Sequence, residues 1–171
     1  MINMLSWNCR GARKPATRRY LKALVFSHSL IVICLLETRV SSFSRRIGRH
    51  WDYTVVPSQG KSGGIILLWL SQFFSVTILT FHKQFLVVNI SYLNKEPWVL
   101  AAIYAHKDYL KRRQIWENIS VHLNDTIPAI LTGGFNCILS QADKKGGKHF
   151  TESLPIHEFA SWITSHDLHD L

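Results

Sequence analysis

The chain has 171 residues, of which 47% are hydrophobic. This is enough for one sizeable core and too little for two independent domains, so residues 1–171 are expected to form a single domain. A formal net charge of +9 favours a polyanion such as nucleic acid as the partner. The 3 cysteines lack CxxC spacing, and the apolar runs fall far short of the ~20 residues of a membrane helix, which argues against a zinc site, a disulfide-rich fold and a membrane protein.

The beginning of the chain predicts a strand, a helix and a second strand. Residues Ile2–Trp7 form a short apolar segment that runs into polar residues, as a core strand ending in a loop should. Pro15 suits the first position of a helix, and apolar residues recur after it at helical spacing. The second strand, Leu30–Leu36, ends at Glu37. Because polar and basic residues stand where a secretory signal needs an apolar stretch, we expect a nuclear or cytoplasmic protein and not a secreted one.

The remainder of the chain is rich in β-branched and aromatic runs separated by turn-prone residues, which predicts antiparallel strands joined by short connections. Asp108 is a suitable N-cap for the helix that follows this region. Helices near both ends with hairpin-like strands between them predict an α/β (α+β) layered sandwich and not a doubly wound parallel sheet. The expected strands are Tyr53–Val56, Gly64–Leu70, Phe74–Thr80, Phe85–Tyr92, Trp98–Ala105 and Ile127–Thr132, and the expected helices are Tyr109–Leu123 and Leu154–Ser165.

Four expected strand ends carry polar residues, which are Asn8, Glu37, Tyr104 and Asn136. If these strands lie side by side, the four side chains converge on one rim of the sheet. A carboxylate and an amide oxygen suit Mg²⁺, and a tyrosine hydroxyl or an asparagine amide can donate to a phosphate oxygen as charge builds up. Each residue alone also has an ordinary explanation as a turn former, a solvated strand terminus or a half-buried sheet aromatic. The combination is compatible with phosphodiester hydrolysis.

Six motifs stand in order along nearly the whole chain: SWNCRG at Ser6–Gly11, LLETR at Leu35–Arg39, GKSGGIILLW at Gly60–Trp69, IYAHKDYLKRRQIWENI at Ile103–Ile119, LTGGFNCIL at Leu131–Leu139 and KKGGK at Lys144–Lys148. Together they resemble the endonuclease domain of plant LINE-type non-LTR retrotransposons. That domain belongs to the endonuclease/exonuclease/phosphatase (DNase I-like) superfamily. SWNCRG and GKSGG favour it over a phosphoinositide phosphatase or a poly(A)-removing nuclease of the same superfamily.

The resemblance implies a four-layered DNase I-like β-sandwich flanked by helices, whose two sheets meet at a metal site. The implied activity is that of a Mg²⁺-dependent phosphodiesterase or endonuclease that nicks DNA so that reverse transcription can be primed. By the same resemblance, Glu37 would bind Mg²⁺ and Asn8 would help to hold the metal shell. Tyr104 would contact the scissile phosphate, and Asn136 would stabilise the oxyanion or position the attacking water.

The chain departs from the family pattern in two ways. The family motif Gly-Asp-Phe-Asn reads Gly-Gly-Phe-Asn at Gly133–Asn136, so Gly134 stands in place of an aspartate that handles the attacking water or the leaving-group proton in relatives. Relatives also continue to a Ser-Asp-His motif, whereas this chain stops at Leu171, so the resemblance implies that a C-terminal part is missing. Loss of a positioned acid or base typically costs about 10²- to 10⁴-fold in rate. We therefore expect an impaired or inactive enzyme.

Basic residues stand close to the expected strand ends. Arg10 follows the first strand, and Lys111, Arg112 and Arg113 open a helix at the end where the macrodipole disfavours cations. These side chains contact phosphate, or they form a solvated positive face; the pattern leaves both explanations open. Together they predict weak, salt-sensitive and sequence-independent binding to DNA through its phosphates.

Three hypotheses follow from the sequence. The first is a working Mg²⁺-dependent endonuclease in which neighbouring groups replace the lost aspartate. The second is an inactive nucleic-acid-binding remnant. The third is a retroelement fragment that does not fold stably, because a sandwich that lacks strands exposes apolar edges. Metal-dependent nicking, salt-sensitive binding and cooperative unfolding distinguish the three.

Overall fold

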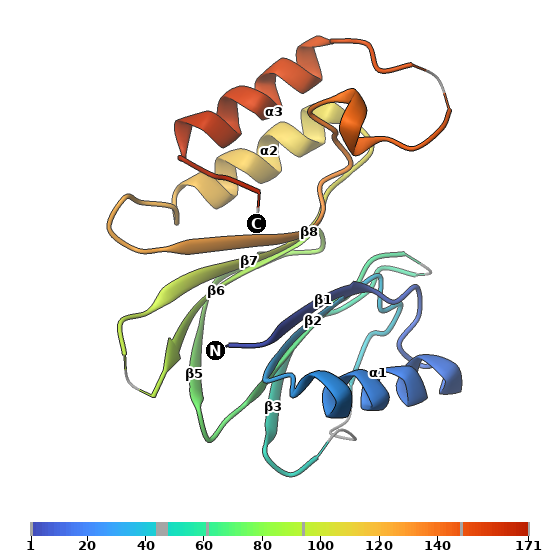
Figure 1. Ribbon diagram of the computed structural model, residues 1–171, viewed down its shortest axis with the longest axis vertical. Helices are drawn as coiled ribbons and strands as arrows, with labels where there is room; N and C mark the ends of the chain where they lie inside the picture. The colour runs from blue at the N-terminus through green and yellow to red at the C-terminus, as the bar shows by residue number, and fades with distance from the viewer. Residues whose placement is uncertain (1, 44–47, 61, 94, 148, 171) are drawn as a thin grey trace.

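The computed structural model describes residues 2–43, 48–60, 62–93, 95–147 and 149–170, so Lys61 and Lys148 of two sequence motifs lie outside the described residues. At its centre two four-stranded sheets face each other (Figure 1). The first sheet has the order β1-β2-β4-β3, with β1 parallel to β2 and the other pairs antiparallel. Helix α1 connects β1 to β2. The elements of this half are β1 (Met4–Asn8), α1 (Pro15–His28), β2 (Val32–Leu36), β3 (Trp51–Val56) and β4 (Ile65–Leu70).

The second sheet has the order β5-β6-β7-β8 and is antiparallel except for its last pair. Helix α2 connects β7 to β8, so each sheet contains one parallel pair joined through a helix. A short 3₁₀ turn, η1, and a last helix, α3, follow β8. The elements of this half are β5 (Phe74–His82), β6 (Phe85–Tyr92), β7 (Trp98–Tyr104), α2 (Tyr109–Ser120), β8 (Ala129–Gly134), η1 (Gln141–Asp143) and α3 (Leu154–Ser165).

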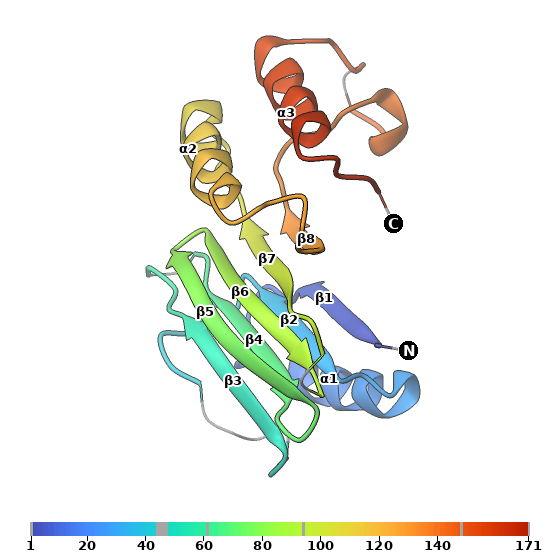
Figure 2. The ribbon, with the colours of Figure 1, turned by 90° about the vertical axis from the view of Figure 1, so that its left-hand side faces the viewer.

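The layers run from α1 through the first sheet and the second sheet to the pair α2 and α3 (Figures 1 and 2). Three apolar clusters fill the spaces between the layers. The predicted α/β sandwich of four layers is therefore confirmed. Both sheets are mixed, which also confirms the exclusion of a doubly wound parallel fold.

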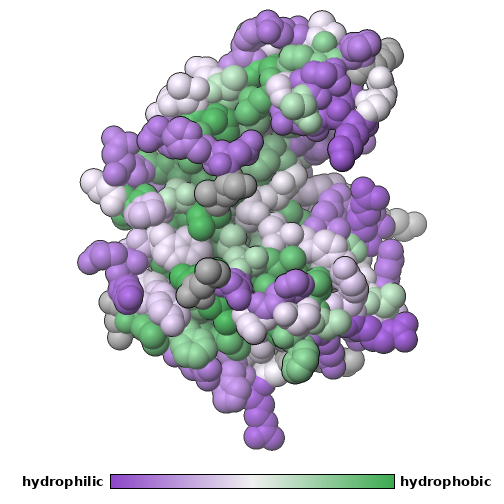
Figure 3. Space-filling view, in the orientation of Figure 1, coloured by the Kyte–Doolittle hydropathy of each residue, from purple (hydrophilic) through white to green (hydrophobic). Residues whose placement is uncertain are grey.

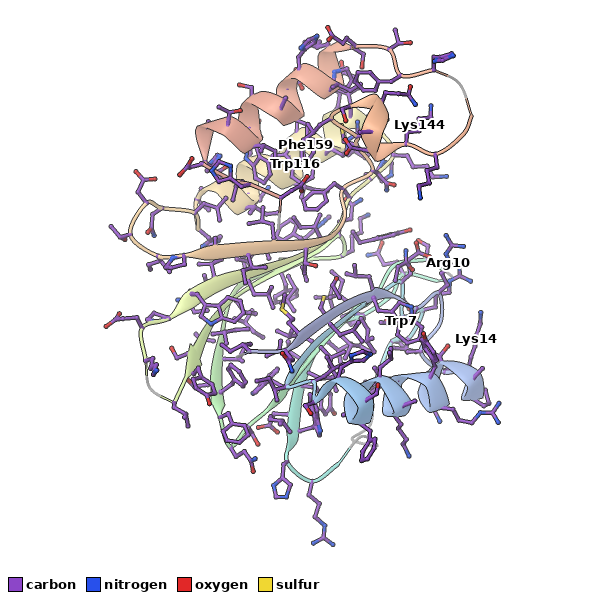
Figure 4. All side chains as sticks on the ribbon, in the orientation of Figure 1. Trp7, Arg10, Lys14, Trp116, Lys144 and Phe159 are labelled. Carbon is purple, nitrogen blue, oxygen red and sulfur yellow. The ribbon has the colours of Figure 1, made fainter. Side chains whose placement is uncertain are left out.

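The cluster between the sheets explains the longest apolar runs of the sequence. All five residues of β2 are buried, because one face meets α1 and the other meets the second sheet. A strand that is buried on both faces needs an unbroken apolar run instead of alternation. On the outer side of the second sheet, Trp116 of α2 stacks on Trp162 of α3 with ring centroids 4.8 Å apart and lies 5.1 Å from the ring of Phe159 (Figure 4). These contacts hold α3 against α2.

Most predicted bounds differ from the observed ones by one to three residues, and two of these differences have clear physical reasons. The last strand begins at Ala129 because Pro128 has no N–H to donate, and only the Pro128 carbonyl joins the ladder, accepting from Val99 at 2.8 Å. Helix α2 ends at Ser120 and not at Leu123. Just after it, the N–H groups of His122 and Leu123 bond to carbonyls three residues back, which is the tighter 3₁₀ pattern. The N-cap predicted for α2 is confirmed, since the Asp108 carboxylate accepts from the second helical N–H at 2.9 Å.

Candidate active site

The carboxyl ends of β1 and β2 place an amide next to a carboxylate. Asn8 is the last residue of β1 and is paired with Leu36, so the residue after Leu36 emerges beside it. The Asn8 amide donates a hydrogen bond of 2.8 Å from its Nδ2 to Oε1 of Glu37. The amide oxygen of Asn8 therefore lies on the same patch of surface as the Glu37 carboxylate.

The turn after β2 fixes the direction in which Glu37 points. Glu37 has φ 51°, a left-handed conformation that a non-glycine residue adopts only where its surroundings hold it. The backbone N–H groups of Thr38 and Arg39 bond to the carbonyls of Gly64 and Gly63 at 3.1 and 3.0 Å, which clamps this turn onto the start of β4. Gly64 has φ +87°, and a Cβ there would collide with the Thr38 hydroxyl oxygen. The GKSGG motif thus includes a glycine that this clamp requires.

A guanidinium lies beside the candidate metal ligand. Nη2 of Arg39 is 3.7 Å from Oε2 of Glu37, and the carboxylate is the more buried partner, with 18% of its side chain exposed against 46% for the arginine. The pair is partly solvated, so its contribution to stability is small. Its chemical consequence is that a cation able to bind a phosphate oxygen stands beside the Glu37 carboxylate.

The second sheet delivers the other two predicted residues. Tyr104 ends β7 and is paired with Gly134 of β8, and Asn136 follows two residues later. The Ala105 N–H donates to the Gly134 carbonyl at 2.8 Å, and Nδ2 of Asn136 donates to the Ala105 carbonyl at 2.5 Å. These bonds tie the segments after β7 and β8 to each other. Asn136 has φ 49°, so it too holds a conformation imposed by the turn.

Tyr104 faces both halves of the site. Burial raises the pKa of the Tyr104 phenol, the Glu37 carboxylate raises it further, and Arg39 opposes the rise. The phenol therefore keeps its proton at neutral pH and can donate a hydrogen bond. Tyr104 and Asn136 also line one pocket of about 290 Å³. Its remaining walls come from the β3–β4, β5–β6 and β7–α2 connections, as Gln59, Ser62, Gly63, Lys83, Gln84, Ala105, His106 and Lys107.

The prediction of a single rim needs correction. Asn8 and Glu37 belong to one sheet and Tyr104 and Asn136 to the other, so the strands that carry them do not lie side by side in one sheet. A hydrogen bond joins Asn8 to Glu37, and Asn136 donates to the carbonyl of Ala105, the residue after Tyr104. The electrostatic influence of Glu37 on Tyr104 links the two pairs across the sandwich. The constellation therefore forms where the ends of two sheets face each other.

Position 134 offers open space where the family motif has an aspartate. No heavy atom lies within 4 Å of a Cβ built on Gly134, and its backbone is outside the left-handed region. Gly134 is directly across the ladder from Tyr104. An aspartate side chain would therefore be accommodated beside the Tyr104 strand end. Gly134 itself has no group that accepts or donates a proton.

The donors present suit a hard cation that keeps much of its water. Among the described residues no group of three or more His, Cys, Asp or Glu side chains could hold a metal ion. Glu37 and Asn8 supply one carboxylate and one amide oxygen that a hydrogen bond holds together. Mg²⁺ is commonly bound through one or two carboxylates, with waters and substrate phosphates filling the other positions. This pair therefore fits a Mg²⁺ ion whose remaining ligands would be water and the substrate phosphate, and it does not enclose the ion with protein ligands alone.

The predicted basic residues have different environments. Arg10 is exposed in the loop after β1, on the side of the molecule where Lys144 of the second half also lies (Figure 4). Lys111 is exposed on α2. Arg112, in contrast, is buried, and its Nη1 donates to the His106 and Lys107 carbonyls at 3.1 and 2.6 Å.

Arg112 is neither a phosphate contact nor part of a solvated positive face, the two explanations that the sequence left open. Its guanidinium instead ties the β7–α2 connection to α2. Arg113 is exposed but forms an ion pair with Glu158 of α3. Its guanidinium therefore already has a carboxylate partner, which holds α3 at the start of α2. Of the three successive cations on α2, only Lys111 has no partner among the described residues.

Sequence reasoning did not single out several residues of the site. Arg39 lies inside the LLETR motif, two residues after Glu37, and its proximity to a carboxylate at a strand end was a usable signal. Lys83 and His106 gave no such signal, because β-strand pairing brings the connections that carry them to the Tyr104 pocket. Nδ1 of His106 accepts from the backbone N–H of Asp108 at 2.9 Å, so the neutral ring carries its proton on Nε2.

Residues 5–168 match the model of the Endonuclease/Exonuclease/phosphatase family, and the chain belongs to that family. No curated protein sequence matches the chain. No helix among the described residues has both the length and the apolar character that a membrane crossing requires.

Solved structures with a similar fold include AP endonucleases. The AP endonuclease LMAP from Leishmania major superposes with a TM-score of 0.68 at 12% identity, over 95% of this chain and 66% of that one. An AP endonuclease from Archaeoglobus fulgidus gives a TM-score of 0.67 at 16% identity, over 96% and 70%. A humanized D. rerio TDP2 with 14 mutations gives 0.59 at 12% identity, over 79% and 66%. These similarities establish the DNase I-like fold, and the chain spans about two thirds of the length of these structures.

Proposed function

We propose that this chain is the endonuclease-type domain of a plant LINE-type retrotransposon that binds DNA phosphates and cuts them slowly or not at all. Family membership and the DNase I-like fold support phosphodiester chemistry. The six ordered motifs support the retrotransposon origin. The single observation that carries the impairment is Gly134, a residue without a side chain at open space beside Tyr104.

In the proposed mechanism, Glu37 and Asn8 would hold Mg²⁺, which would polarise a phosphate oxygen when bound. Tyr104 donates its phenolic proton in a hydrogen bond to a non-bridging oxygen of the scissile phosphate, and its raised pKa keeps that proton in place. Asn136 has one N–H committed to the Ala105 carbonyl, which orients its remaining N–H and its oxygen for the phosphate or the attacking water. Arg39 adds positive charge near the same phosphate.

The proposed active site lacks a group that can accept the proton of the attacking water. Attack by water requires a group that takes the proton, and in the proposed site Glu37 is engaged by Asn8 and Arg39. His106 lines the same pocket, but the hydrogen bond from Asp108 occupies its Nδ1 lone pair. We therefore expect a rate lower by about 10²- to 10⁴-fold than that of the same site with an aspartate at position 134.

The test restores the missing carboxylate. Gly134→Asp is expected to increase Mg²⁺-dependent nicking of a supercoiled plasmid by about 10²- to 10⁴-fold. The double variant Gly134→Asp/Glu37→Gln removes the ligand charge while retaining side-chain shape, and it is expected to lose the gain. Gly134→Asn is the matched control, because it fills the same space without a base. Nicking by a folded Gly134→Asp variant at the wild-type rate would contradict the proposal.

A second candidate function, DNA binding without cleavage, is favoured by one observation. The connections around the site carry Arg10, Lys83 and Lys107, and the chain has a net charge of +9. Binding to a blunt duplex should weaken linearly with the logarithm of salt concentration, with a slope of about −0.9 per phosphate contacted. Equal affinity at low and high salt would exclude this function. Genomic DNA that codes for a reverse transcriptase next to the gene would support the retroelement origin.

A further inference from the structure

A second pocket lies on the outer side of the first sheet, between α1 and the segment that follows Glu37. Its volume is about 430 Å³, which is within the range of small-molecule and nucleotide sites. Its floor is formed by Leu21, Leu35 and Val40, all of which are buried. The other lining residues are Ala12, Arg13, Thr17, Arg18, Lys22, Ser42 and Phe43. None of them belongs to the candidate active site.

Three cations stand around this apolar floor. Arg13, Arg18 and Lys22 are exposed, and none of them has an ion-pair or hydrogen-bond partner among the described residues. Helix α1 has no acidic residue. Arg18 and Lys22 are four residues apart on one face, where like charges repel, and Arg13 precedes the positive end of the helix dipole. This arrangement works against helix stability and favours an anion. Figure 3 shows hydrophilic residues gathered at the right-hand edge of this half, where α1 begins.

The wall of the pocket also contains a polar group without a partner. Thr17 is only 9% exposed and lines the pocket, yet its hydroxyl makes no hydrogen bond among the described residues. Solvent reaches this hydroxyl, because the buried side-chain atoms without a partner among the described residues belong to Thr38 and Asn89. A bound ligand with polar edges can therefore take the place of water at the Thr17 hydroxyl. The pocket therefore combines an apolar floor, a free hydroxyl and a cationic rim.

An aromatic ring completes the pocket. Phe43 is half-buried and lines the cavity, and Tyr53 supports it edge-to-face with ring centroids 5.3 Å apart. Sites for single-stranded nucleic acid pair aromatic rings, on which bases stack, with cations that follow the backbone. The rise along α1 puts Arg18 and Lys22 about 6 Å apart along the axis, which suits neighbouring phosphates of an extended strand.

We propose that this pocket binds a single-stranded segment of nucleic acid, with one unstacked base against Phe43 and its flanking phosphates on Arg13, Arg18 and Lys22. A duplex would not enter, because its bases are stacked and paired. The pocket walls come from the segments that follow Asn8 and Glu37, so a strand bound here continues toward the candidate active site. The substrate class is thus DNA with an unpaired segment beside the duplex. The inference rests on the proposed function only for the nature of the partner, since binding needs neither metal nor catalysis.

The test measures binding in EDTA by fluorescence polarisation of a labelled single-stranded oligothymidine. Arg18→Ala is expected to reduce the magnitude of the salt slope by about 0.7, the value for one phosphate of a single strand. Arg19→Ala is the matched control, because Arg19 is the adjacent exposed arginine and does not line the pocket. It should leave the slope almost unchanged. Equal losses in the two variants would overturn the proposal.

Two further variants test the base contact. Phe43→Leu keeps the apolar volume and removes the stacking face, and it should weaken oligothymidine binding by about 5- to 150-fold. Thr17→Val replaces the hydroxyl with a methyl group of similar size and should weaken binding without lowering the Tm, which separates a ligand contact from a folding role. Binding unchanged in both variants would overturn the proposal. So would an acidic peptide that displaces the oligonucleotide at equal concentration, because the pocket would then fit a protein partner.

The outcome is independent of the nuclease proposal. If Gly134→Asp fails to gain nicking activity, the EDTA binding results for Arg18→Ala and Phe43→Leu still decide the accessory site. If Gly134→Asp nicks plasmid, Phe43→Leu in that background should leave the cutting of blunt duplex unchanged while the preference for a substrate with an unpaired segment is lost.

Discussion

Two adjacent glycines of β8 should respond in opposite ways to the same substitution. Gly133 has φ +129°, and a Cβ there would collide with the backbone carbonyl of Ile103 and lie 3.0 Å from a methyl group of Leu36. A left-handed conformation costs an alanine about 1–3 kcal/mol, and overpacking adds about 1–3 kcal/mol. Because the obstructing atom belongs to the β7–β8 ladder, it cannot move without breaking sheet hydrogen bonds. We expect Gly133→Ala to destabilise the fold by about 2–6 kcal/mol.

Gly134→Ala is the control, because nothing lies within 4 Å of its Cβ. It should change the free energy of unfolding by less than about 1 kcal/mol, with a small gain from reduced freedom of the unfolded chain. Urea denaturation measures both variants, and at ~2–4 °C of Tm per kcal/mol the pair should differ by at least ~4 °C in thermal scans. A difference below ~1 kcal/mol between the two variants would refute the close packing of Gly133 against β7.

Three other predictions concern single side chains. Removing the Glu37 charge with Glu37→Gln should lower the pKa of Tyr104 toward its ordinary value, because Glu37 contributes to the raised pKa; ultraviolet titration against Tyr104→Phe measures this. Lys111→Ala should reduce the salt slope of duplex binding by about 0.9, whereas Arg112→Ala should leave the slope unchanged and destabilise the fold by about 2–4 kcal/mol through two lost hydrogen bonds. Burial raises the pKa of Cys34 from 9.0 to about 12, so its contribution to stability is complete below pH 9 and is lost as the pH rises toward 12, which unfolding curves across that range would show.

Most of the secondary structure could be predicted from local patterns. Strand β6 and helix α3 have the predicted bounds, because the first is an apolar run between turn residues and the second has Pro155 in its first turn and regular apolar spacing. A predicted strand boundary was wrong where the presence of a backbone N–H determines the first residue of the strand, as at Pro128. A residue pattern shows that a strand exists more readily than it shows which N–H begins the ladder.

The candidate site was accessible from sequence only in part. The strand-end rule singled out Asn8 and Glu37, which the parallel β1–β2 pair brings into hydrogen-bond contact. The same rule could not tell that Tyr104 belongs to the opposite sheet. The prediction that Arg112 is a surface cation was wrong, because a charged side chain is normally exposed. Arg112 is buried because loop carbonyls accept its hydrogen bonds, and the position of these carbonyls depends on the tertiary structure.

The hydrophobic cluster between the sheets sets the distance between the two halves of the candidate site. Glu37 and Tyr104 stand on separate sheets whose separation is set by side chains such as Leu67, Leu86 and Leu100. Trimming or enlarging one of these side chains would move two chemical groups relative to each other without touching either. The geometry of the candidate site therefore depends on the hydrophobic interior, so a substitution far from its polar residues can change how they are aligned.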